Sequence, residues 1–131
     1  MNAKVTLVGF IFGLVVGVIM RLPGAEFVVA AHAINLSVMA SLWLGAALAP
    51  DQDFRAGVQE TIVAIITYVL VALVFQHSPL WLYIGYLLQT VWSALHINNR
   101  HGVLTREWFP TFAMTVNVGF VISLYLLRQL T

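Results

Sequence analysis

Three carboxamide side chains lie near the middle of long apolar segments of this chain: Asn35, Gln89 and Asn117. An amide that faces hydrocarbon leaves its donors and acceptors without partners, which is costly in an apolar medium. We therefore expect all three amides to face inward and to meet, where they could bind a small neutral solute or a dehydrated ion. The alternative is that each one only hydrogen-bonds a neighbouring helix and holds the structure together.

Three further polar side chains in the same segments, His32, Ser37 and Thr115, extend this candidate binding site. We find no Asp, Glu, Lys or Arg deep in any apolar segment. This pattern argues against a proton relay or a sodium site that uses a buried acid, because such sites place ionisable groups inside the membrane. The expected site is therefore neutral.

The histidines allow a second kind of site. A haem or a metal ion would need imidazoles at one depth on facing helices, and only His32 and His77 meet that requirement. No H-x-x-E-H or H-E-x-x-H motif and no Cys accompanies them. We therefore expect no cofactor, with haem or metal at these two histidines as a minor alternative, and we expect His32 to hydrogen-bond across the structure.

The most polar stretch is 96–108, which holds two histidines and two arginines: His96, Arg100, His101 and Arg106. These side chains could hold a lipid phosphate or an anionic solute at a membrane surface. Basic residues at a cytoplasmic helix end also follow from the positive-inside rule alone. A third interpretation makes His96 or His101 a general base that acts on a lipid head group.

The composition decides the class of protein. The chain has 131 residues, of which 61% are hydrophobic and 8% are charged, whereas soluble domains carry roughly 25% charged residues. This indicates an all-α integral membrane protein in contact with membrane lipids. The net charge is +1 and the basic residues stand singly, which excludes a nucleic-acid partner. Without Cys there is no thiol chemistry.

A spanning helix needs about 20 mostly apolar residues, and the chain offers five such segments joined by short turns. We predict a five-transmembrane-helix bundle that forms a single transmembrane domain over 1–131, with the first span retained as an anchor. The predicted spans are about 4–20, 27–49, 58–76, 79–97 and 108–128.

Three glycines four residues apart, Gly9, Gly13 and Gly17, line one face of the first span. Such small-residue faces allow two helix backbones to approach closely and drive helix association in lipid. This face could pack inside the chain, against the second or fifth span. It could instead form the interface of a homo-oligomer or of a complex with a partner membrane subunit.

Residues 27–44 and 109–126 resemble two copies of one helix, and Asn35 matches Asn117 in this alignment. The two segments are three spans apart, so they run in opposite directions and predict an inverted repeat of spans 1–2 and 4–5. The sixth helix of a complete repeat is missing. Inverted repeats recur in transporters, with the substrate site near the midplane.

Basic residues favour one orientation, with the N-terminus inside and the C-terminus outside a bacterial inner membrane. Two lie on the C-terminal side, Arg21 and Arg128. Four lie on the N-terminal side: Lys4, Arg55, Arg100 and Arg106. The aromatic rings toward the span ends are expected to anchor the chain at the interface: Trp43, Trp81, Trp92, Trp108 and Tyr125.

Taken together, these features favour a small transporter or channel-like protein for a small solute or ion, assembled as a homo-oligomer. The first alternative is an accessory subunit of a larger membrane complex, which would dock through the glycine face of the first span. The second alternative is a lipid-modifying enzyme that uses the residues of the stretch 96–108. We find no acidic cluster to bind the Mg²⁺ that such enzymes often need, so an enzyme is the least favoured class.

Overall fold

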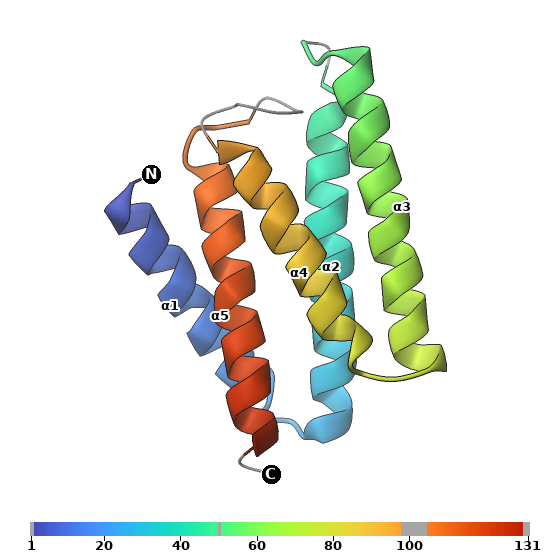
Figure 1. The fold of residues 1–131 in the computed structure, drawn as a ribbon. Coiled ribbons are helices and arrows are strands. Elements are labelled where there is room, and N and C mark those ends of the chain that lie inside the picture. Colours follow the sequence, from blue (N-terminus) through green and yellow to red (C-terminus); the bar gives the residue numbers. More distant parts are fainter. Residues whose placement is uncertain (1, 50, 98–104, 130–131) are drawn as a thin grey trace.

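Five helices make up the fold, and no strand occurs within the described residues. The computed structural model describes residues 2–49, 51–97 and 105–129 (Figure 1). The helices are α1 (Ala3–Ile19), α2 (Ala25–Ala47), α3 (Phe54–Gln76), α4 (Trp81–Leu95) and α5 (Phe109–Gln129). The prediction of five helices is confirmed. The largest difference is that α3 begins at Phe54 rather than at residue 58.

Successive helices alternate in direction, as their short connections require (Figure 1). The N-terminus, the α2–α3 turn and the start of α5 lie at one end, which we call the upper end. The α1–α2 and α3–α4 turns lie with the C-terminus at the lower end. One consequence is that α2 and α4 run parallel to each other, whereas α5 runs antiparallel to both.

Three of these helices are long and apolar enough to cross a membrane: α2, α3 and residues 109–127 of α5, with mean hydropathies of 1.7, 2.2 and 1.6. The other two are shorter, with 17 residues in α1 and 15 in α4. At 1.5 Å per residue they measure about 25 Å and 22 Å, against a hydrocarbon core of about 30 Å.

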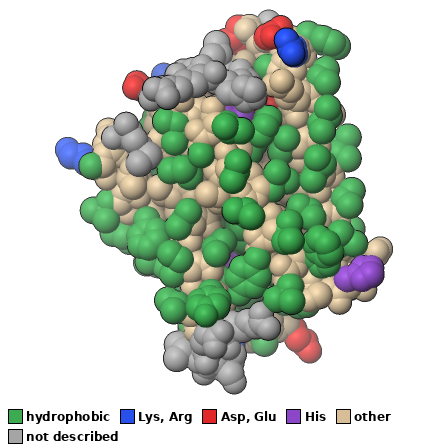
Figure 2. All heavy atoms as spheres, in the orientation of Figure 1, with side chains coloured by type: hydrophobic (Ala, Val, Ile, Leu, Met, Phe, Trp, Pro, Cys, Tyr) green, Lys and Arg blue, Asp and Glu red, His purple; other side chains and the backbone are tan. Residues whose placement is uncertain are grey.

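The outer surface is apolar. Large hydrophobic side chains such as Leu7, Ile34 and Ile65 are more than half exposed, at 59%, 64% and 56%. Figure 2 shows such side chains over the middle of the visible face, with charged side chains toward the upper and lower ends. Many buried side chains are polar instead, including His32, Glu60, Gln89, His96 and Asn117. This inside-out distribution suits a lipid surrounding better than water.

The glycine face of α1 lies against α5. Gly9, Gly13 and Gly17 are the buried residues of α1. A Cβ atom on Gly13 would overlap the carbonyl oxygen of Val116, and the Cα of Gly119 lies 3.0 Å from the same position. Of the two predicted uses of this face, the structure shows packing within the chain, against the fifth helix.

Side chains from α2, α3, α4 and α5 meet in the apolar core. Its largest cluster is formed by Ala33, Leu36, Val74, Leu82, Tyr86, Val116 and Phe120. Helix α4 packs against α2, α3 and α5, so its inner face is enclosed on three sides. Polar side chains on this inner face of α4 are therefore buried.

The α1–α2 turn depends on Gly24, whose φ of 128° and ψ of 168° are available essentially to glycine alone. We expect Gly24→Ala to lower the free energy of unfolding by about 1–3 kcal/mol. Gly45 is the matched control, because a Cβ there meets nothing within 4 Å and its helical backbone suits alanine. Gly45→Ala should raise stability by up to about 1 kcal/mol. Equal effects in thermal unfolding of the two variants would contradict this assignment.

Candidate functional site

A row of polar side chains runs along the inner face of α4 and its C-cap. The spacing of three, four and three residues keeps the side chains on one helical face. All four have an exposed fraction of 0%. From the lower to the upper end they are Tyr86, Gln89, Ser93 and His96. We call these four residues the polar row, and each part of it meets polar groups from another helix.

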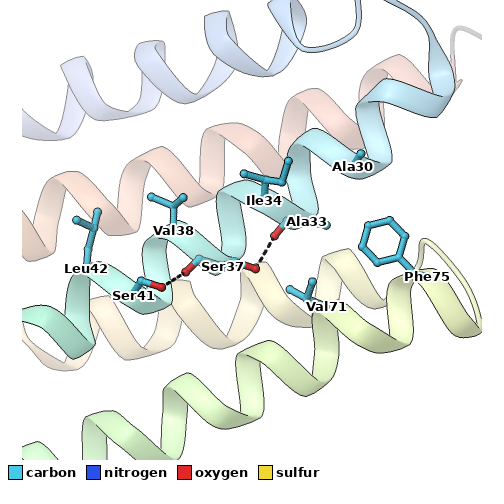
Figure 3. Close-up of a pocket in the computed structure, with 9 residues that line it drawn as sticks. All are labelled: Ala30, Ala33, Ile34, Ser37, Val38, Ser41, Leu42, Val71 and Phe75. Atoms are coloured by element: carbon cyan, nitrogen blue, oxygen red, sulfur yellow. Dashed lines mark hydrogen bonds between the residues drawn. The ribbon is translucent and has the colours of Figure 1, made fainter.

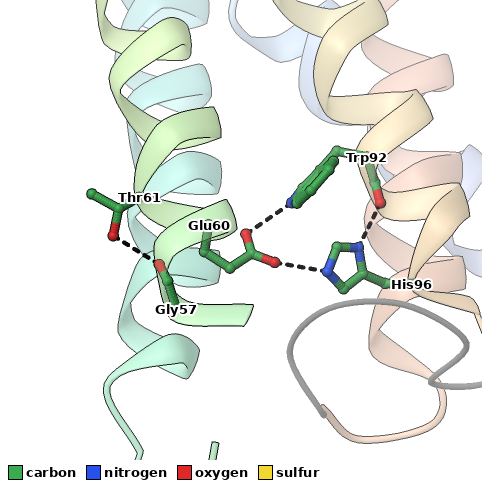
Figure 4. A network of polar contacts seen from close by, with 5 residues as sticks. All are labelled: Gly57, Glu60, Thr61, Trp92 and His96. Atoms are coloured by element: carbon green, nitrogen blue, oxygen red, sulfur yellow. Dashed lines mark hydrogen bonds and ion pairs between the residues drawn. The ribbon is translucent and has the colours of Figure 1, made fainter. Parts of the chain in front are cut away.

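At the upper end the polar row meets a buried carboxylate. Glu60 of α3 is 1% exposed, and its Oε1 lies 2.7 Å from Nε2 of His96. The indole Nε1 of Trp92 donates a hydrogen bond of 2.8 Å to Oε2 of Glu60 (Figure 4). Glu60 therefore bridges α3 and α4 through both carboxylate oxygens.

The two ring nitrogens of His96 make different contacts. Nδ1 of His96 is 2.7 Å from the carbonyl oxygen of Trp92, and a carbonyl can only accept, so Nδ1 carries a hydrogen. Nε2 lies 2.7 Å from Oε1 of Glu60, which is an ion-pair distance, although this contact does not have hydrogen-bond geometry.

Aromatic rings screen this pair. The ring centroids of Trp43 and Trp92 lie 4.5 Å and 5.0 Å from that of His96. Trp43 is 1% exposed and packs 5.1 Å from the ring of Phe109. The expectation that Trp43 anchors the chain at an interface is wrong, because the inner face of α2 turns this ring into the core. The rings leave the pair in a dry environment, where electrostatic interactions are strong.

In the middle of the polar row, hydrogen-bonding capacity is left unused. Gln89 donates from Nε2 to the hydroxyl of Thr67 at 2.8 Å, but its buried Oε1 has no hydrogen-bond partner. Asn117 of α5 is 0% exposed, and neither its Nδ2 nor its Oδ1 has a hydrogen-bond partner. The hydroxyl of Ser93 is also buried without one. Such orphaned groups are rare in protein interiors.

Ring contacts fix the relative heights of these groups. The rings of Tyr86 and Phe120 stack 5.7 Å apart between the antiparallel helices α4 and α5. Three residues further along α4 and three residues back along α5, Gln89 and Asn117 therefore lie at similar heights. His32 also contacts Phe120, at 5.7 Å, so the same reasoning places Asn35 of α2 at this height. No hydrogen bond joins any two of the amides Asn35, Gln89 and Asn117 in the structure.

At the lower end the polar row meets His32 of α2. Nδ1 of His32 lies 2.6 Å from the hydroxyl of Tyr86, which also accepts a hydrogen bond of 3.0 Å from Nδ2 of Asn35. Since Asn35 donates to this oxygen, the hydroxyl hydrogen is available to His32. One turn further down, the buried side chains of Val28 and Leu82 line a pocket of about 390 Å³ together with Arg21 and Tyr83.

Two predicted site residues lie away from the polar row. Ser37 is half-buried and donates to the carbonyl oxygen of Ala33 at 3.0 Å. It lines a groove of about 440 Å³ between α2 and α3 (Figure 3). Thr115 donates to the carbonyl oxygen of Thr111 at 2.9 Å and lies beside Gly9 of α1. Their hydroxyls are satisfied by their own helices, so neither is free for a ligand in this arrangement.

One member of the predicted head-group site lies in the core. His96 is buried and paired with Glu60, so it cannot face a lipid phosphate, and that part of the prediction is wrong. Arg106 is exposed just before α5. Arg100 and His101 lie outside the described residues. A catalytic role for His96 on a lipid head group would need access that this burial denies.

The predicted pair for haem or metal falls into two different environments. His32 is buried against Tyr86, whereas His77 is exposed at the end of α3. Within the part of the chain that the structure describes, no group of three or more His, Asp and Glu residues could hold a metal ion.

Glu60 is the functional candidate that the sequence analysis missed. It lies only two residues into the span predicted at 58–76, so it did not count as an ionisable residue deep in an apolar segment. Because α3 begins at Phe54, Glu60 falls in its second turn and faces α4. A signal was present: Glu60 and Thr67 are seven residues apart, a spacing that places both on one helical face.

No protein-family model matches the chain, and no curated protein or solved structure is similar to it. The roles of the polar row and its partners are therefore assigned by geometry and chemistry, from the residues that could bind, orient or exchange hydrogens at each height.

Proposed function

We propose that the chain is an integral membrane protein in which all five helices span the bilayer, and that a small solute or ion passes along the polar row. The apolar outer surface and the polar interior support this role, because the interior offers hydrogen-bonding groups that the lipid tails lack. The observation that carries the proposal is Asn117, a fully buried amide whose two polar atoms have no hydrogen-bond partner.

An amide that only holds helices together would use its hydrogen bonds for that purpose. Asn35 does so with Tyr86, and Gln89 uses Nε2 with Thr67. Asn117 makes no such bond, so its burial costs about 1–3 kcal/mol without stabilising any helix contact. A group of this kind is explained if it binds something that enters the bundle. Oε1 of Gln89, at a similar height, would share that ligand.

The polar row is closed to the surroundings, because all four of its side chains are 0% exposed. Beside its lower end, the apolar side chains of Val28 and Leu82 line the lower pocket, and apolar constrictions can gate by excluding water. At its upper end, His96 is buried beside Glu60 and the ring of Trp43. A closed pathway with polar contents favours a transporter or a gated channel over an open pore.

The inverted repeat is a separate part of the proposal. Helices α2 and α5 run in opposite directions, as it requires. Matched positions differ in burial, however: Trp43 is 1% exposed, whereas Tyr125 is 54% exposed. We therefore propose the repeat only as an ancestral relation, and passage along the polar row does not depend on it. A homo-oligomer in a bacterial inner membrane, with the N-terminus inside, completes the proposal.

The accessory-subunit alternative loses its expected docking face, because α5 already covers the glycines of α1. In the enzyme alternative, His96 could not reach a lipid head group, because its side chain is buried. No observation therefore favours either alternative over passage along the polar row.

The test measures flux in proteoliposomes that contain the purified chain or its Asn117→Leu variant. Glycerol and urea flux is followed by light scattering, and K⁺, Na⁺ and H⁺ flux by fluorescent indicators. Loss of Asn117 should reduce flux of the transported species about tenfold, which corresponds to roughly 1.4 kcal/mol of lost binding. The same variant should unfold at an equal or higher temperature, because it removes an orphaned polar group.

Thr61→Val is the matched control. The hydroxyl of Thr61 is exposed and donates only to the carbonyl oxygen of Gly57 in its own helix. This variant also removes one polar group, but it should leave flux unchanged. Flux that is absent from the unmodified protein for every species, or that survives in Asn117→Leu, would overturn the proposal.

A further inference from the structure

The two ends of the polar row hold groups that can exchange a proton. A carboxylate and an imidazole meet at the upper end, with Glu60 Oε1 2.7 Å from His96 Nε2. A phenol and an imidazole meet at the lower end, with the Tyr86 hydroxyl 2.6 Å from His32 Nδ1. All four side chains are at most 1% exposed. Buried ionisable groups inside a membrane bundle mark ion or proton pathways by default.

Neutral polar groups lie between the two ends. Along α4, successive members of the polar row are separated by about 4.5 to 6 Å of helix axis. One water molecule with two hydrogen bonds of about 2.8 Å spans a similar distance. The orphaned atoms of Ser93, Gln89 and Asn117 lie along this stretch. They offer a bridging water the two or more polar partners that a buried water requires.

We infer that the species passing along the polar row is the proton, exchanged at the Glu60–His96 pair above and at the Tyr86–His32 pair below. This inference rests on the proposed function and names its substrate. A neutral solute would need neither pair, and an alkali ion would need a cage of oxygens without imidazoles.

Each exchange is a simple proton transfer. At the upper pair, the Glu60 carboxylate takes up a proton beside His96 and then gives it to the row. At the lower pair, the Tyr86 hydroxyl gives its proton to Nδ1 of His32 and takes one from the row. The imidazolium of His32 then releases a proton from Nε2. One proton enters and one leaves, and no electron is transferred.

Asn35 sets the direction of the lower step. Its Nδ2 donates to the Tyr86 oxygen, so the hydroxyl hydrogen points to His32 rather than back along the polar row. Asn35 is therefore a positioning residue. It touches the exchanging hydroxyl but carries no exchangeable proton of its own at neutral pH.

The experiment uses the full chain in liposomes loaded with the pH indicator pyranine, with valinomycin and a K⁺ gradient to impose a membrane potential. The unmodified protein should carry protons at a rate that slows in D₂O. Glu60→Gln and Tyr86→Phe should each reduce proton flux about tenfold or more, because each removes one exchange site while keeping its shape. Thr61→Val should leave proton flux unchanged.

Tyr86→Phe provides a second test if Glu60→Gln fails to fold. It keeps the ring that stacks on Phe120 and loses only the hydroxyl, so its fold is checked by thermal unfolding before flux is measured. Proton flux that survives in folded Tyr86→Phe overturns the inference. Flux of glycerol, urea, K⁺ or Na⁺ without proton flux overturns it as well, but leaves the proposed function standing. No flux of any species overturns both.

Discussion

Replacement of Gly13 by leucine is expected to detach α1 from α5 and to lower the free energy of unfolding by at least about 3 kcal/mol. The added side chain would meet backbone on the facing helix, with the Val116 carbonyl oxygen at the Cβ position and the Gly119 Cα 3.0 Å away. Backbone atoms cannot rotate away as a side chain can. In lipid, apolar burial does not compensate, since close van der Waals packing itself holds the helices together.

Val15→Leu is the control for this prediction, because Val15 lies on α1 and is 51% exposed. Thermal unfolding in detergent should separate the two variants clearly. The chain has no Cys, so cysteines introduced at Phe12 and Phe112 would report the contact directly. The rings of these two residues lie 5.8 Å apart, and a short thiol cross-linker should join them only while α1 lies on α5. Equal stability and cross-linking in Gly13→Leu would contradict the packing.

Gly119 allows a sharper form of the same test. A Cβ on Gly119 would lie 2.9 Å from the Cα of Gly13, so each glycine makes room for the other helix. Once one substitution has separated the helices, the second meets no further overlap. We expect the effects of Gly13→Ala and Gly119→Ala to be far from additive in the double variant, as for neighbours in one contact.

The five helices and their short turns were predictable because their signals are local. The length of an apolar run can be read directly from the sequence. A residue such as Pro110 indicates a helix start independently of the rest of the chain. The glycine face of α1 was equally local, since three positions on one helix define it. The choice of α5 as its partner was not, because several helices could have filled that role.

The contacts across the core were harder to predict, because they depend on how each helix is rotated. Apolar side chains occur on every side of α2, so its sequence does not reveal its buried face. Trp43 therefore resembled an interface anchor until the structure placed it against His96. To predict the pairing of Glu60 with His96, one would have needed the rotations of α3 and α4 and the earlier start of α3. The inward direction of the amides followed from desolvation alone, but not Tyr86 as the partner of Asn35.

The second large effect concerns the upper pair. His96→Leu should lower the free energy of unfolding by about 3–5 kcal/mol, because it leaves the buried carboxylate of Glu60 without its partner. Glu60 is 1% exposed, so water cannot replace the imidazole. Chemical unfolding in mixed micelles would measure this loss.

The double variant Glu60→Leu with His96→Leu should recover much of that stability. It removes both members of the pair. Beyond the hydrogen bond to the Trp92 carbonyl oxygen that His96→Leu already removes, it takes the Glu60 acceptor from Nε1 of Trp92, at a cost of about 1–3 kcal/mol. A double variant less stable than His96→Leu would show that the pair itself stabilises the bundle. If instead the double variant folds well and conducts no protons, the pair is retained for exchange rather than stability. That outcome would explain why an apolar core keeps a buried acid where leucine would fold as well.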